Sequence, residues 1–164
     1  MSTSRRPPTI ELLAALARGR DPFIDVFNRT MLDIPAIECV TLLATAPDRS
    51  VIHRVGSSDP GRFPIGGFDP IDDGTWCRRI FGDKQPIVAN DPLQMRAFVP
   101  ETDDLVAMGY EAIVCMPIVI ATDMRGTLNV LGEAGAFAPP ALAEIEAMLP
   151  FAALIFTFEG IELP

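Results

Sequence analysis

Histidine, tryptophan and tyrosine each occur once in this chain, and cysteine only three times. A structural zinc site needs about four closely arranged ligands, and the sequence has no C-x-x-C pair to begin one. Cys39, Cys77 and Cys115 are an odd number, which argues against a disulfide framework. His53 lies on an expected edge strand, where we predict a surface residue rather than a haem ligand. We therefore expect no metal ion and no cofactor.

Basic charge is also scarce, because 13 lysines and arginines stand against 22 aspartates and glutamates. The net charge is −9 and the pI is about 4.5. Non-specific binding to nucleic acids or to anionic membranes requires a basic surface. We therefore expect neither nucleic acid nor membrane as a partner.

Long apolar runs are missing as well. The best candidate, AMLPFAALIFTF at 147–158, is far shorter than the roughly 20 residues of a membrane-spanning helix. The beginning of the chain, MSTSRRPPTIELLAAL, has neither a long apolar segment nor a small-residue cleavage site, which a secretory signal requires. These features predict a soluble, cytoplasmic protein.

Apolar residues are nevertheless plentiful, at 49% of 164 residues, with a mean hydropathy of +0.28. This length and composition suit one domain with a full core. Residues 1–8 are polar and proline-containing, which predicts a flexible tail. We expect a single domain over residues 9–164.

Hydrophobic periodicity predicts an α+β domain. We expect a helix from Thr9 to Gly19 and a second helix with Asp21 as N-cap and Pro22 in its first turn. Strands are expected at 37–46, 50–56, 85–90, 111–121 and 124–133, with the last hairpin turning at Thr122-Asp123. Between them we expect a long loop with one short strand at 57–74, a short helix at 75–82 and an irregular or weakly helical segment at 91–110. A final helix opens at Pro139-Pro140, is expected to kink at Pro150 and continues through Phe158.

Five short motifs accompany this order of elements. They are G-x-x-C at 74–77, P-I-V-x-N-D at 86–91, M-G-Y-E-A-I-V-C-M-P-I at 108–118, R-G-T-L-N-V at 125–130, and Phe137 before an amphipathic helix. In this order and spacing, the chain resembles a GAF domain over about residues 20–158. The IVCMPI segment is similar to the matching strand in the GAF domains of cyclic-nucleotide phosphodiesterases.

The resemblance implies a PAS-related fold with a central antiparallel sheet. N- and C-terminal helices are expected on one face, and a ligand pocket on the other face, under loops and short helices from about 57–110. Most GAF domains are regulatory modules. The resemblance thus implies a small-molecule sensor without catalytic activity that signals through a partner protein or through a homodimer formed by the terminal helices.

Strand alternation puts Ile113 and Cys115 on one face of their strand, and Thr127 and Asn129 on one face of the next strand. The resemblance places both pairs toward the ligand, with further contacts from the covering segment and with Asp91 capping the site or its turn. The predicted ligand site is Trp76, Cys77, Asp91, Met108, Tyr110, Ile113, Cys115, Thr127 and Asn129. It contains no convincing general acid or base, so we expect a small, neutral or weakly polar ligand.

Cys77 raises an alternative, because a few GAF domains are enzymes, the free methionine-(R)-sulfoxide reductases. Cys77 matches one cysteine of that family, but the segment comparable to its catalytic cysteine reads LVAMGY at 105–110. A further cysteine about ten residues before Cys77 is also missing. We therefore expect Cys77 to pack on a short helix beside the pocket. A redox enzyme of this type, or a degenerate GAF domain used only for protein interaction, stays open as an alternative.

Overall fold

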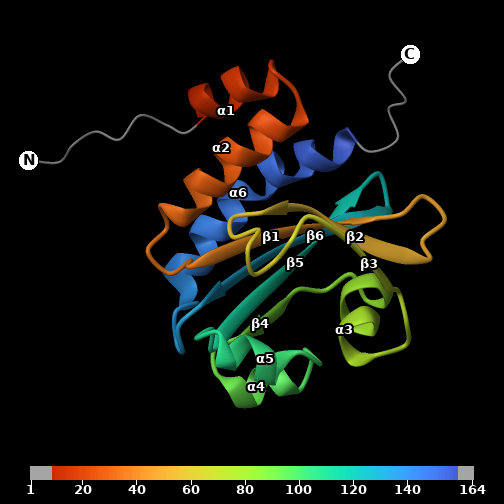
Figure 1. Cartoon of the computed structure of the whole chain (residues 1–164), viewed down its shortest axis with the longest axis vertical. Coiled ribbons are helices and arrows are strands. Elements are labelled where there is room, and N and C mark those ends of the chain that lie inside the picture. The colour runs from red at the N-terminus through yellow and green to blue at the C-terminus, as the bar shows by residue number, and fades with distance from the viewer. Residues whose placement is uncertain (1–8, 159–164) are drawn as a thin grey trace, which may run out of the picture.

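The computed structural model describes residues 9–158, which form a six-stranded sheet with helices on both faces (Figure 1). The strand order is β3-β2-β1-β6-β5-β4, and all neighbouring strands are antiparallel. The strands are β1 (Cys39–Thr45), β2 (Val51–Ser57), β3 (Gly66–Pro70), β4 (Ile87–Ala89), β5 (Ala112–Ile120) and β6 (Asp123–Gly132). The expected α+β class and antiparallel sheet are confirmed.

The central strands β1, β5 and β6 are almost continuously buried, because both of their faces are covered. Their runs of Val, Ile and Leu suit such positions. Between β5 and β6, Ala121 and Thr122 have φ angles of 49° and 71°. A two-residue connection with positive φ matches the twist of a tight hairpin. The turn thus lies one residue earlier than expected.

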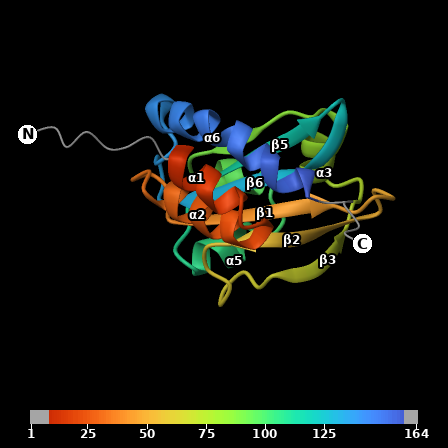
Figure 2. The ribbon, with the colours of Figure 1, turned by 90° about the horizontal axis from the view of Figure 1, so that it is seen from above.

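Three helices cover one face of the sheet: α1 (Thr9–Leu16), α2 (Arg20–Leu32) and α6 (Pro139–Thr157). Seen from above in Figure 2, they lie across the central strands. The core between them contains Phe23, Phe27, Leu42, Val114, Met116, Leu128, Val130, Phe137, Ile145, Ile155 and Phe156, among others. Helices from the two ends of the chain therefore share one face, as the resemblance implies.

The segment between β2 and β5 covers the opposite face (Figure 1). Besides β3 and β4 it contains α3 (Thr75–Cys77), which leads into a π-helical turn (Arg78–Gly82), followed by α4 (Pro92–Arg96) and α5 (Thr102–Ala107). We call this segment the excursion. The second core, on this face, consists of Cys39, Ile80, Ile87, Ala89, Met95, Val99, Leu105, Tyr110, Ile113, Cys115, Met124 and Leu131.

Some local expectations were wrong. The second helix begins at Arg20 rather than after Asp21, because Gly19 adopts a φ of 115° and serves as its N-cap. β2 is not an edge strand, since β3 pairs with it, and His53 is therefore a partly buried residue inside the sheet. The final helix continues past Pro150 to Thr157, as expected.

By length and composition α6 is the one helix within residues 9–158 that could cross a membrane. Five of its side chains are buried: Ile145, Met148, Ala152, Ile155 and Phe156. All five belong to the core between the helices and the sheet. One side of α6 therefore packs against the sheet.

Candidate functional site

A row of polar side chains crosses the centre of the sheet on the face under the excursion. Asn129 in β6 is paired with Thr41 in β1 on one side and with Cys115 in β5 on the other. Directly paired residues of antiparallel strands project to the same face. Cys115 belongs to the core under the excursion, so Asn129 and Thr41 point the same way. Thr127 lies two residues before Asn129 on that face.

Two atoms of this row lack a hydrogen-bond partner within residues 9–158. They are Asn129 Oδ1 and Thr127 Oγ1. Asn129 Nδ2 donates to Thr41 Oγ1 at a long distance of 3.5 Å. Thr127 is 0% exposed and Asn129 7%. Leaving a buried polar atom unpaired costs about 1–3 kcal/mol, so a ligand or an ordered water that paired with these atoms would remove this cost.

Trp76 connects the excursion to this row of polar side chains through Cys115. Its Nε1 donates to Cys115 Sγ at 3.4 Å, and its ring meets Phe81 edge-on with 5.7 Å between centroids. Complete burial raises the pKa of Cys115 to about 12. The Cys115 thiol is therefore neutral at physiological pH, which disfavours a role as a nucleophile.

Cys77 lies at the end of α3, buried but outside the core that contains the polar row. Burial raises its pKa, and the neighbouring Asp72 carboxylate disfavours the thiolate further. Enhanced thiol reactivity requires a lowered pKa and an electropositive environment. The surroundings of Cys77 instead raise its pKa through burial and a neighbouring carboxylate, which disfavours a role as a nucleophile.

The structure brings together only some of the nine predicted site residues. Trp76, Tyr110, Ile113 and Cys115 pack in the core under the excursion, on the face that carries Thr127 and Asn129. Asp91 instead caps α4, because its Oδ1 accepts a hydrogen bond from Gln94 N at 2.8 Å. Met108 is exposed at the end of α5.

The polar side chains of the expected pocket, Thr127 and Asn129, are buried under the excursion. The two surface hollows described for residues 9–158 lie elsewhere. One is next to α1 and α2, beside Glu11 and Arg29. The other lies at the β1–β2 and β5–β6 turns, beside Arg49 and Arg125. Neither contains a predicted site residue.

Two residues on the face under the excursion, Thr41 and Arg54, were not identified from the sequence. Thr41 lies in the strand CVTLLAT, two residues from both Cys39 and Leu43. Strand alternation puts these three side chains on one face, and this was the signal in the sequence that could have identified Thr41. Arg54 pairs with Leu43 and therefore shares the face. Its guanidinium lies 5.6 Å from the Phe63 ring centroid and donates to Pro64 O at 3.1 Å. Burial lowers the pKa of Arg54.

No family model and no curated protein sequence matches this chain. Solved structures match it over most of its length. The GAF domain of a phosphoenolpyruvate-protein phosphotransferase from Acinetobacter is 9% identical, with a TM-score of 0.72 over 92% of this chain and 89% of that one. The equivalent domain from Coxiella burnetii is 15% identical, with a TM-score of 0.71 over 90% and 88%. The GAF domain of a two-component sensor histidine kinase from Bacillus halodurans is 16% identical, with a TM-score of 0.64 over 82% and 93%. The chain therefore has the fold of a GAF domain.

Proposed function

We propose that this protein is a sensory GAF domain that binds a small molecule between the sheet and the excursion and has no catalytic activity. The observation that carries the proposal is the pair of buried, unpartnered atoms Asn129 Oδ1 and Thr127 Oγ1 on the covered face. Structural neighbours include the GAF domain of a sensor histidine kinase and a region of a methyl-accepting chemotaxis protein. These relationships support a sensory role.

The surroundings of the two atoms favour a small, uncharged or weakly polar ligand. Ile113 and Cys115 provide an apolar wall, and Trp76 and Tyr110 provide aromatic surface. A mostly apolar site with a few oriented polar groups is typical of small-molecule pockets. In this proposal Asn129 and Thr127 fix the orientation of the ligand.

The redox alternative is disfavoured by the state of the thiols. All three cysteines are free and buried, and burial raises the pKa of each. A thiol-based reductase needs a thiolate and a resolving thiol. Three free thiols also suit a reducing compartment, which supports our placement of the protein in the cytoplasm.

We propose that the protein transmits its signal through a homodimer formed by the terminal helices. Ile10 and Leu13 are exposed on α1, and Phe151 and Leu154 are only partly buried on α6. Contiguous exposed apolar surface is typical of an interface. Leu12 and Ile155 on the same two helices are buried within the subunit and do not contribute to this surface.

Native mass spectrometry of freshly purified protein tests the binding proposal. We expect a co-purifying small molecule, or stabilisation by a member of a panel of neutral metabolites in a thermal-shift assay. Removing the buried amide in Asn129→Leu is expected to weaken binding about ten- to a hundredfold while the domain stays folded. Failure of both assays to find any ligand would contradict the proposal and favour a module used only for protein interaction.

A further inference from the structure

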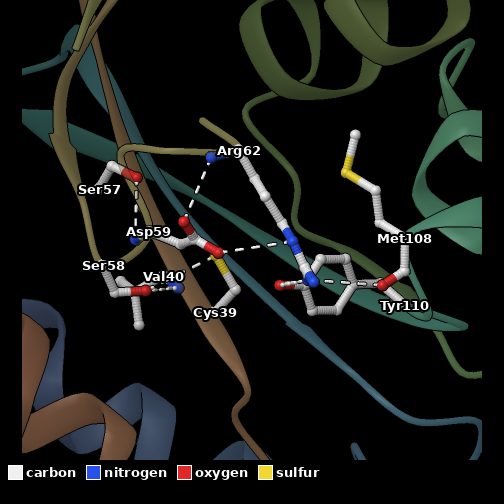
Figure 3. A network of polar contacts seen from close by, with 8 residues as sticks. All are labelled: Cys39, Val40, Ser57, Ser58, Asp59, Arg62, Met108 and Tyr110. Atoms are coloured by element: carbon white, nitrogen blue, oxygen red, sulfur yellow. Dashed lines mark hydrogen bonds and ion pairs between the residues drawn. The ribbon is translucent and has the colours of Figure 1, made fainter. Parts of the chain in front are cut away.

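The connection between β2 and β3, residues 58–65, crosses the edge of the covered face, and we call it the strap (Figure 3). Its first residue is tied to β1. Ser58 N donates to Val40 O at 2.9 Å, and Ser58 Oγ accepts from Val40 N at 2.8 Å. Directly after the strap, Gly66 and Gly67 have φ angles of 83° and 71°. The strap thus runs from a fixed end to a pair of glycines in the left-handed region.

Arg62 holds the middle of the strap to Met108 and Tyr110, while Arg54 of β2 holds Phe63 and Pro64 further along the strap. Arg62 Nη1 donates to Tyr110 Oη at 3.1 Å and to Met108 O at 3.5 Å, and its guanidinium lies 5.7 Å from the Tyr110 ring centroid (Figure 3). Asp59 orients it from within the strap, with 3.7 Å between Arg62 Nε and Asp59 Oδ2. Charge-assisted hydrogen bonds of this kind are stronger than neutral ones.

Cys39 lies beneath the strap and is 0% exposed. Its Sγ accepts a hydrogen bond from Ser58 Oγ at 3.6 Å (Figure 3). Cys39 begins β1 and belongs to the core that contains Tyr110 and Cys115. Exposure of Cys39 would therefore report that this edge of the covered face has opened.

The strap is sparsely packed against the covered face. Its only contribution to the core is Phe63, which is partly buried and lies 6.1 Å from Tyr110, measured between ring centroids. The other covering elements are anchored more deeply, by Ile80, Met95 and Leu105, all buried in that core. Segments with few buried apolar contacts open at the lowest free energy.

We propose that the strap is a lid over the covered face and that the Arg62–Tyr110 contact is its latch. This inference rests on the proposed function, because a ligand that reaches Thr127 and Asn129 under the excursion needs a moving segment for entry. Opening releases Arg62 from Tyr110 and Pro64 O from Arg54, while Gly66 stays paired with Arg54 in the sheet. It uncovers Cys39 and leaves the Trp76–Cys115 contact in place.

The rate of thiol alkylation tests the latch on the full chain without any ligand. Wild type and Arg62→Ala are treated with N-ethylmaleimide, and each cysteine is quantified by peptide mass spectrometry. We expect Cys39 labelling to rise about tenfold in Arg62→Ala, while Cys115 labelling changes by less than about twofold. Loss of the nearby cation disfavours the Cys39 thiolate, so faster labelling reports exposure rather than higher intrinsic reactivity.

Two further variants make the result specific. Arg96→Ala is the matched control, because the Arg96 side chain is 54% exposed against 51% for Arg62 and pairs with Asp103 at 2.9 Å. It is expected to leave Cys39 labelling unchanged. Tyr110→Phe keeps the ring but removes the hydroxyl acceptor, and a smaller rise of about threefold is expected.

Equal acceleration of Cys39 and Cys115 would overturn the proposal, since it would report global unfolding. Unchanged Cys39 labelling in Tyr110→Phe would overturn it as well, whether or not Arg62→Ala folds. Because no ligand enters this experiment, the latch can be supported even when the ligand search fails. A ligand can likewise be found when the latch is disproved.

Discussion

At the scale of single residues, Thr102 in α5 and Thr127 in β6 are equally buried but differ in their hydrogen bonding. Thr102 Oγ1 donates to Val99 O at 2.6 Å, and the residue is 1% exposed. Thr127 is equally buried, yet its Oγ1 has no partner within residues 9–158. Replacement by valine removes the hydroxyl from each position and nearly preserves the shape.

We expect the two substitutions to have opposite effects on the free energy of unfolding of the ligand-free protein. Thr102→Val is expected to lose about 1 kcal/mol, because a satisfied hydrogen bond disappears. Thr127→Val is expected to gain about 1 kcal/mol, because an unpaired buried hydroxyl is removed. Urea denaturation measures both values. A loss of stability in Thr127→Val would mean that an ordered water already satisfies the hydroxyl.

Cys115 gives stability a dependence on alkaline pH. Its ordinary pKa of 9.0 rises to about 12 in the folded state because of burial. Below pH 9 the thiol is neutral in both the folded and the unfolded state. Between about pH 9 and pH 12 only the unfolded state ionises, so the contribution of Cys115 to stability is lost as the pH rises.

The measurement compares the unfolding free energy of wild type and Cys115→Ala at pH 8 and pH 10.5. We expect the advantage of wild type to shrink at the higher pH. Other groups that titrate in this range are present in both proteins and cancel in the difference. A constant difference between the two proteins would contradict the raised pKa.

At the scale of elements, Gly126 sets how closely β6 approaches β1 and α6. A Cβ at this position would lie 2.2 Å from Leu43 O and 2.4 Å from Phe156 Cε1. Neither a backbone carbonyl in a paired strand nor a buried ring can move away cheaply. The absence of a side chain here is therefore a packing requirement.

Gly126→Ala is expected to lower the free energy of unfolding by about 1–3 kcal/mol, the usual cost of overpacking. Gly82→Ala is the control, since a Cβ there meets nothing within 4 Å, and we expect a change of less than about 0.5 kcal/mol. Chemical denaturation of both variants measures the difference. Equal effects would show that the strands separate easily at Gly126.

Much of the element pattern could be predicted from the sequence, because apolar alternation and turn residues are local signals. The parity that places Ile113 and Cys115 under the excursion followed from alternation together with the family resemblance. The helices α4 and α5 were not predicted as such, since each is too short for a clear period. The contact of Arg62 with Tyr110 was also beyond the sequence, because it joins residues 48 positions apart through the folded strap.

At the scale of the whole molecule, the proposed homodimer can be tested by a substitution on α1, which contributes exposed apolar side chains to the proposed interface. Leu13 is 53% exposed, whereas its neighbour Leu12 is buried in the core. A charge at Leu13 therefore changes the surface without entering the interior. Phe68, exposed on β3, offers an apolar control position outside the terminal helices. Figure 2 shows β3 at the edge of the sheet.

We expect wild type and Phe68→Glu to be dimers at tens of micromolar, and Leu13→Glu to be a monomer, because desolvating a charge in an apolar interface is costly. Multi-angle light scattering after size-exclusion chromatography measures the mass. A monomeric wild type would refute self-association through this face. A dimeric Leu13→Glu would move the interface away from α1.

The pleat of β6 has a mechanical consequence. Asn129 faces the excursion, while Leu128 and Val130 on either side of it belong to the helix-side core. Adjacent side chains of a strand project to opposite faces. A shift of β6 by even a fraction of an ångström at Asn129 therefore also moves Leu128 and Val130, which pack in the core beneath α6. The proposed ligand contact at Asn129 and the helix-side contacts of Leu128 and Val130 would thus lie on opposite faces of one strand. A movement caused by the ligand would reach the terminal helices directly through β6.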